Sequence, residues 1–294
     1  MMDSLCPQCG ATSSEVLEVL LDQRRRLYCD DCNKPFLAGT AQPVPSPSTA
    51  STRRAGSVRA YDAARPAFSK TDQVDPARRE RVETLKARFL DEHPQPEVGV
   101  AAFWEDYQKV FSRDGLSRPD VTKLHRFANS QVGASVGPMT NFNNAFNELG
   151  PQEAARRVVE ASAYVLYGEQ GPAEEHPEDR LTYLLQQDSP LGVKGWREAL
   201  LTKTLAVVEP QRIIPIVTYE SSRDLGKRAM AARIWGLTLP APDRTSMTLG
   251  RLIYWSNDLL LELAGDGFAH AQHVSQFLWW IKDFPEQLEG RHDP

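Results

Sequence analysis

The sequence predicts a mainly α-helical protein that also carries a small N-terminal β-hairpin module. Three observations predict this class. The four cysteines form two pairs between positions 6 and 32, a Pro- and Ser-rich stretch follows them, and helical periodicity dominates beyond position 75. We therefore expect a zinc ribbon over residues 1–37, a disordered linker over residues 38–75 and an all-helical domain over residues 76–294.

The composition is that of a globular protein, with 294 residues, 41% hydrophobic and 25% charged. A formal net charge of -5 argues against a protein that coats nucleic acid over its whole surface, because such binding needs dense lysine and arginine. No apolar run reaches the length of a membrane span, and the first residues lack the pattern of a signal peptide. We expect a cytoplasmic protein without membrane contact.

The zinc ribbon is predicted from Cys6, Cys9, Cys29 and Cys32. Each pair has the Cys-x-x-Cys spacing that lets two thiolates face one tetrahedral Zn²⁺, and 19 residues separate the pairs. Alternating polar and apolar residues over Glu15–Leu20, a turn over Asp22–Arg26 and a second strand from Leu27 predict a hairpin between the pairs. So short a segment would depend on zinc for its folding. A redox-active dithiol is the alternative for such cysteines.

A resemblance supports this assignment. Cys-Pro-x-Cys-Gly followed by Arg-x-Leu-Tyr-Cys-x-x-Cys-x-x-x-Phe resembles the zinc ribbons of transposases and transcription-associated proteins, over Cys6 to Phe36 only. The resemblance implies a bound metal and either DNA binding or protein docking. Arg24, Arg25 and Arg26, expected at the hairpin turn, are candidates to contact DNA phosphates, the alternative being a solvated turn.

The linker is predicted from composition. Residues 38–75 are rich in Pro, Ser, Thr and Ala and show no periodic apolar face, which is typical of an extended tether. No acidic residue occurs between Asp31 and Asp62, whereas Arg53, Arg54 and Arg59 are positive. The linker therefore either attracts phosphate without regard to sequence or serves only as a soluble spacer.

The helical domain begins at Asp75-Pro76, an N-cap followed by a first-turn proline. Short connections rich in Pro and Gly separate the later helices, and strand signals are nearly absent. Most of the tryptophans lie among apolar neighbours and are expected in the core. The further helices are expected at about Val100–Phe111, Pro119–Ala128, Pro151–Tyr167, Glu178–Gln187, Gly195–Val208, Lys227–Leu237, Met247–Ala264 and His270–Asp283.

A Gly-x-x-Gly turn at Gly192 and Gly195 precedes one of these helices. Backbone N–H groups at such a turn, together with the positive end of the following helix, are able to hold a phosphate. Lys194, Arg197 and Lys203 lie nearby in sequence and complete the candidate nucleic-acid site. The alternative is a glycine helix cap in front of a core helix.

The segment from Leu181 to Trp280 carries a second resemblance, through this glycine turn, Glu209-Pro210-Gln211-Arg212-Ile213-Ile214-Pro215 and the final Phe277-Leu278-Trp279-Trp280. These motifs resemble the helical region of McrB-like modification-dependent restriction proteins and related phage-defence factors. The sequence lacks Gly-x-x-x-x-Gly-Lys-Ser/Thr, the motif of an NTPase motor. The resemblance therefore implies that a motor or nuclease would be a separate subunit.

Catalytic motifs are few. Asp120 and Lys123 lack the second acid of a magnesium-dependent nuclease, and His270 and His273 are expected to have a surface or capping role rather than to share a metal. Residues 141–147 hold an asparagine cluster that is interpreted as a turn with two buried phenylalanines, the alternative being contacts to bases. We expect a DNA-binding or adaptor subunit of a bacterial restriction or phage-defence complex, non-catalytic by itself. The alternatives are a protein-docking module and an enzyme with its active site in the helical domain.

Overall fold

The computed structural model describes residues 19–21, 24–28, 35–37 and 61–290, without residues 175, 187, 188, 222 and 224. The chain divides into two units, Met1–Ala55 and Gly56–Pro294. In the first unit, strands β1 (Val19–Leu21), β2 (Arg24–Tyr28) and β3 (Pro35–Leu37) form an antiparallel sheet in the order β1-β2-β3. In this sheet Leu21 lies opposite Arg24, and Leu27 lies opposite Phe36.

The three arginines expected at the hairpin turn are instead the first residues of β2. The register explains this difference. The first part of β2 pairs with β1 and its last part pairs with β3, so the strand must extend back to Arg24 to meet both neighbours. The expectation of a turn at Arg24–Arg26 is corrected to a central strand.

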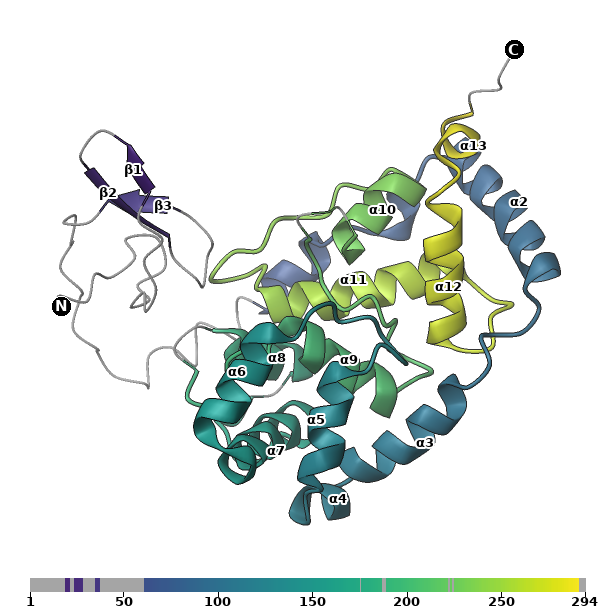
Figure 1. Cartoon of the computed structure of the whole chain (residues 1–294). Coiled ribbons are helices and arrows are strands. Elements are labelled where there is room, and N and C mark those ends of the chain that lie inside the picture. Colours follow the sequence, from purple (N-terminus) through teal and green to yellow (C-terminus); the bar gives the residue numbers. More distant parts are fainter. Residues whose placement is uncertain are drawn as a thin grey trace. The chain divides into compact units, whose positions relative to one another are not determined.

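The second unit is mainly helical, as expected, and contains no strand among the residues described from 61 to 290 (Figure 1). Its elements are a helix at residues 61–67, the 3-10 helix η1 (Thr71–Gln73), α2 (Pro76–Glu92), α3 (Val100–Phe111), α4 (Arg113–Ser117), α5 (Val121–Asn129), α6 (Thr140–Leu149), α7 (Pro151–Tyr167), α8 (Pro177–Leu185), α9 (Glu198–Val208), α10 (Lys227–Trp235), α11 (Leu249–Ala264), α12 (Ala271–Ile281) and α13 (Pro285–Glu289).

Residues 61–74 belong to the helical unit and not to the linker, which corrects the boundary expected at residue 75. Ala64, Phe68 and Val74 are buried, and the Phe68 ring meets Trp255 edge-on at 5.7 Å between centroids. Ala64 and Phe68 have helical i, i+4 spacing, but a single such pair is too short to indicate a helix in the sequence. They are ordered by tertiary packing, which is the main source of helix stability in proteins.

Local chemistry sets the start of α2 as the sequence predicts, whereas α5 begins at Val121 and not at the predicted Pro119. Asp75 caps α2 by accepting a hydrogen bond from the Arg78 N–H, and Asp120 caps α5 by accepting from the Lys123 N–H. Pro76 occupies the first turn of α2, where backbone N–H groups have no partner within the helix. The missing N–H of proline therefore costs no hydrogen bond there.

The core gathers around α8 and α11, which approach closely because Gly250 has no side chain. A Cβ at Gly250 would lie 2.3 Å from the Thr182 nitrogen and 2.4 Å from the Glu178 carbonyl oxygen. Trp255 of α11 is fully buried, as are Trp196 and Trp235. Figure 1 shows α2 alongside α12 and α13 at one side of this unit.

Candidate functional site

The predicted zinc ligands Cys6, Cys9, Cys29 and Cys32 lie outside the described residues. In the part of the chain that the structure does describe, no group of three or more His, Cys, Asp or Glu side chains is arranged to hold a metal ion. Zinc binding therefore stays a prediction from the cysteine spacing.

The glycine turn before α9 packs against α6. Gly192 and Gly195 have φ values of +92° and +86°, which an L-residue rarely adopts. A Cβ at Gly195 would lie 2.4 Å from the backbone nitrogen of Phe142. Gly195 therefore lets the backbone of this turn approach the backbone of α6, and α9 begins at Glu198 rather than at the predicted Gly195.

Lys203 does not lie at the surface, so its assignment to a phosphate site is corrected. Its side chain is fully buried, and its Nζ donates to the carbonyl oxygens of Phe127, at 3.1 Å, and Ser130. It also lies over the Phe127 ring, 4.9 Å from the centroid. Burial lowers the pKa of Lys203 to about 8. The ammonium caps the C-terminal end of α5, where the helix dipole favours a cation.

Arg197 also has a structural contact, which weakens its assignment to the same site. Its Nη1 donates to the carbonyl oxygens of Leu184, at 2.7 Å, and Gln186, at 3.1 Å. These carbonyls belong to the C-terminal end of α8, where they have no partner within the helix. Lys194 is exposed, so the structure leaves one of the three predicted cations on the surface.

The other motifs that the sequence offers are structural. Asn143 and Asn129 exchange two hydrogen bonds between their side-chain amides, at 3.0 and 2.9 Å. The segment expected to be an asparagine-rich turn is the helix α6, and its Phe142 and Phe146 are buried as predicted. His270 caps α12, and the Nε2 of buried His273 lies 2.9 Å from the His93 carbonyl oxygen.

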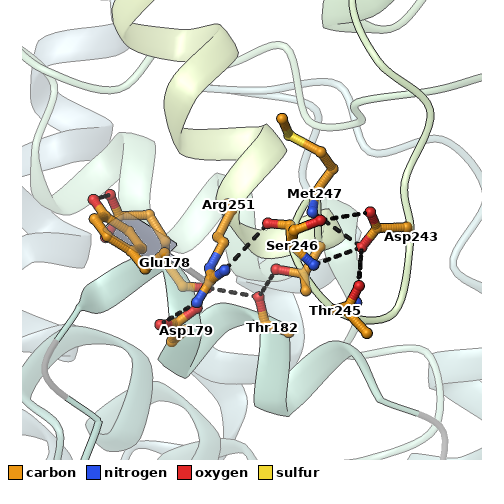
Figure 2. A network of polar contacts seen from close by, with 10 residues as sticks. Glu178, Asp179, Thr182, Asp243, Thr245, Ser246, Met247 and Arg251 are labelled. Carbon is orange, nitrogen blue, oxygen red and sulfur yellow. Dashed lines mark hydrogen bonds and ion pairs between the residues drawn. The ribbon is translucent and has the colours of Figure 1, made fainter. Parts of the chain in front are cut away.

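A charged network joins α8 to α11 (Figure 2). The Arg251 guanidinium is paired with both carboxylate oxygens of Asp179, at 2.6 Å from Nε and 3.0 Å from Nη2. Its Nη1 donates to the Ser246 carbonyl oxygen at 3.1 Å. Arg251 is only 1% exposed, so this guanidinium binds its own chain and is closed to an incoming substrate.

Two aromatic rings cover the network where the helical unit begins. The Tyr61 ring stacks on His176 with 3.6 Å between centroids and 6° between planes, and the Arg251 guanidinium lies 5.1 Å from the Tyr61 centroid. The Tyr61 hydroxyl donates to Glu178 Oε1 at 3.1 Å. Burial and the Glu178 carboxylate raise the pKa of Tyr61.

Asp243 holds the loop that leads into α11. Its Oδ1 accepts hydrogen bonds from the N–H groups of Thr245, Ser246 and Met247, at 2.7, 2.8 and 3.0 Å. Partial burial raises the pKa of Asp243, but these hydrogen bonds outweigh that effect and leave the pKa below its ordinary value. Figure 2 shows Asp243 and the residues that it binds beside Arg251, whose Nη1 reaches the Ser246 carbonyl oxygen of the same loop.

A second buried polar group contains Lys227, Asn257 and Glu198. Lys227 Nζ lies 3.3 Å from both the Ile253 carbonyl oxygen and Asn257 Oδ1. Burial lowers the pKa of Lys227 to about 7. Burial also raises the pKa of Glu198 to about 7, against the opposing effects of the hydrogen bond from the Tyr219 N–H and of the Lys227 charge. Both groups titrate near neutral pH, yet both are tied to the backbone.

Sequence reasoning missed Asp179, Arg251 and Lys227. A signal was present for Arg251, because it stands in the apolar run Leu249-Gly250-Arg251-Leu252-Ile253 and so had to be buried with a partner. The partner could not be found, since Asp179 lies 72 positions away.

Comparison with known proteins gives no relative, because no family model, curated protein or solved structure matches the chain. No helix within the described ranges combines the length and the apolar character that crossing a bilayer requires.

Proposed function

We propose that the protein is a cytoplasmic, zinc-dependent DNA-binding adaptor, non-catalytic by itself. The observation that carries this proposal is the paired Cys-x-x-Cys spacing of Cys6, Cys9, Cys29 and Cys32 beside the basic run Arg24–Arg26. Zinc would fold the N-terminal module, and the guanidinium groups would contact phosphates, which their planar fork can hold with two hydrogen bonds.

The contacts of the helical unit favour a structural role for this unit. Of the three cations of this unit that the sequence offered for DNA, Lys203 is buried and Arg197 binds carbonyl oxygens of α8, which leaves Lys194 exposed. The charged groups joining α8 and α11 are likewise satisfied by one another. This arrangement supports a scaffold role for the helical unit, with DNA contact assigned to the ribbon and the linker.

The biological setting proposed is a bacterial restriction or phage-defence complex. This part rests on the sequence resemblance of Leu181 to Trp280 alone. It assigns any motor or nuclease activity to a separate subunit, which the adaptor would bring to DNA.

A gel-shift titration of duplex DNA against salt tests the proposal. We expect affinity to fall steeply with salt, and the triple variant Arg24→Ala, Arg25→Ala, Arg26→Ala to reduce the salt slope by about one unit for each phosphate that it no longer neutralises. The variant should keep its zinc, since no arginine is a ligand.

The matched control removes the same charge from the helical unit, through Arg126→Ala, Arg233→Ala and Arg244→Ala at three exposed positions. It should leave the salt slope unchanged. A protein that shifts no duplex at any salt concentration is a docking module and not a DNA-binding adaptor.

A further inference from the structure

A groove lies on the helical unit between the segment before α3, the segment between α5 and α6, and one face of α12. Its volume is about 660 Å³, within the range of about 300–1,000 Å³ that is usual for ligand pockets. The charged network and the glycine turn contribute no residue to it. Six of its lining residues define its chemistry, namely Glu97, Val98, Val132, Gln272, Gln276 and Trp279.

The rims of the groove carry exposed apolar side chains. Val98 is 97% exposed and Val132 is 45% exposed, and within residues 61–290 as described no other large apolar side chain is so open to solvent. Both valines line the same groove, and Trp279 lines it on α12. Single exposed apolar residues are ordinary, whereas two that line one groove leave apolar area there that a bound side chain would cover.

The segment that carries Val132 is held by contacts with residues of α3 and α9. Gly133 has a φ of +79°, and a Cβ there would lie 3.1 Å from two carbons of the Phe103 ring. Buried Lys203 donates to the carbonyl oxygen of Ser130, at the start of this segment. These two contacts hold residues 130–133 in place, which reduces the ordering entropy that binding at this segment would cost.

The face of α12 supplies hydrogen-bonding groups. Gln272, Ser275 and Gln276 all line the groove. The Oε1 atom of Gln272 is buried and accepts no hydrogen bond from the described residues. Amides and hydroxyls both donate and accept, so this face suits the alternating N–H and C=O groups of an extended backbone.

The charge of the groove selects among ligands. Glu97 is the one ionisable side chain among its lining residues. A carboxylate repels phosphate and attracts a cation, so the groove disfavours nucleic acid and favours a basic group at its Glu97 end.

We propose that this groove binds an extended segment of a partner protein. In the bound state an aliphatic side chain of the partner lies between Val98 and Val132, its backbone N–H groups face Gln272 and Gln276, and a lysine or arginine lies beside Glu97. The proposal rests on the adaptor function proposed above, and it names the surface and the chemistry of the partner.

The test selects a displayed library of random heptapeptides on the full-length protein and measures the selected peptides by isothermal titration. We expect peptides that combine an aliphatic residue with Lys or Arg. The double variant Val98→Asp, Val132→Asp should weaken their binding at least tenfold, and Glu97→Lys should weaken it as well. Thr122→Asp, at an exposed position of α5 outside the groove, should leave it unchanged.

The proposal is overturned if no peptide is selected, if the selected peptides are acidic, or if they bind the double variant as tightly as the unaltered protein. Displacement of the peptides by a single-stranded oligonucleotide would also overturn it, in favour of a nucleic-acid groove. The variants are compared by circular dichroism to show that they fold.

Duplex binding is measured on the same variants, so the two proposals fail separately. The groove variants should shift duplex DNA like the unaltered protein. Failure to shift DNA removes the adaptor function and leaves the peptide results standing, whereas failure to bind peptides removes only the groove.

Discussion

Three cationic side chains, Lys203, Lys227 and Arg251, lie inside the helical unit with no more than 1% of their surface exposed. Arg251 meets a carboxylate, whereas the two lysines meet mainly carbonyl and amide oxygens. Neutral acceptors compensate a buried charge less well, so burial lowers the pKa of Lys203 to about 8 and that of Lys227 to about 7.

Lys227→Met should make the protein more stable at neutral pH, by about 1–4 kcal/mol, because it replaces a buried charge with an apolar chain of similar length. The folded protein loses the Lys227 proton near pH 7, and the unfolded chain keeps it until about pH 10.4. The free energy of unfolding of the unaltered protein should therefore rise with pH above pH 7. The variant should lack this rise, because it has no proton to lose at this position.

Urea unfolding followed by tryptophan fluorescence checks this, since all six tryptophans lie in the helical unit. The difference in free energy of unfolding between Lys227→Met and the unaltered protein should be largest at pH 6–7 and smaller at pH 9.5. Lys109→Met, at an exposed position, is the matched control and should show no such trend. A constant difference across this pH range would contradict the depressed pKa.

Sequence pattern predicted some helices well and others poorly. The bounds of α3 and α7 agree with prediction because each has a clear apolar stripe between strong punctuation, such as Gly150-Pro151 and Gly168. The helix α6 was wrongly interpreted as a turn, since asparagine has low helix propensity. Its Phe142 and Phe146 pack into the core, and tertiary packing overrides that local preference.

The contact between α8 and α11 depends on the Asp179–Arg251 pair. Asp179→Asn should destabilise the helical unit by about 3–5 kcal/mol, because it leaves the buried guanidinium without its counter-charge. Thermal unfolding measures the loss. Asp283→Asn breaks the Lys282–Asp283 ion pair, whose carboxylate is 69% exposed, and should change stability by about 0.5 kcal/mol or less. Equal effects of both variants would show that burial does not matter at Asp179.

At the scale of the whole chain, composition predicted the helical class but placed the start of the helical unit too late. Phe68 was assigned to the linker because its contact with Trp255 exists only in the folded unit, and Val74 is likewise buried only there. The candidate site was less predictable still. Lys203 lies in the run Leu200-Leu201-Thr202-Lys203-Thr204-Leu205, whose apolar neighbours were the one sign that this cation would be buried.

Cys29→Ser should release zinc and unfold the N-terminal module while leaving the helical unit folded, because the two units are separate. Elemental analysis gives the zinc content, and tryptophan fluorescence reports the helical unit alone. Limited proteolysis should cut first between Thr40 and residue 60, upstream of the packed Tyr61. Absence of zinc from the unaltered protein, or first cleavage beyond residue 61, would contradict this organisation.

The stacking of Tyr61 on His176 has a mechanical consequence. A force applied at Tyr61, the first residue of this unit that the structure describes, acts on a ring that also meets Trp255 edge-on at 5.5 Å between centroids. The load is thus carried by α8 and α11, the most closely packed helices of the unit, before any peripheral helix such as α2. A pull on Tyr61 is therefore resisted by the core itself, and the first described turn of this unit should detach only when the packing of α8 and α11 yields.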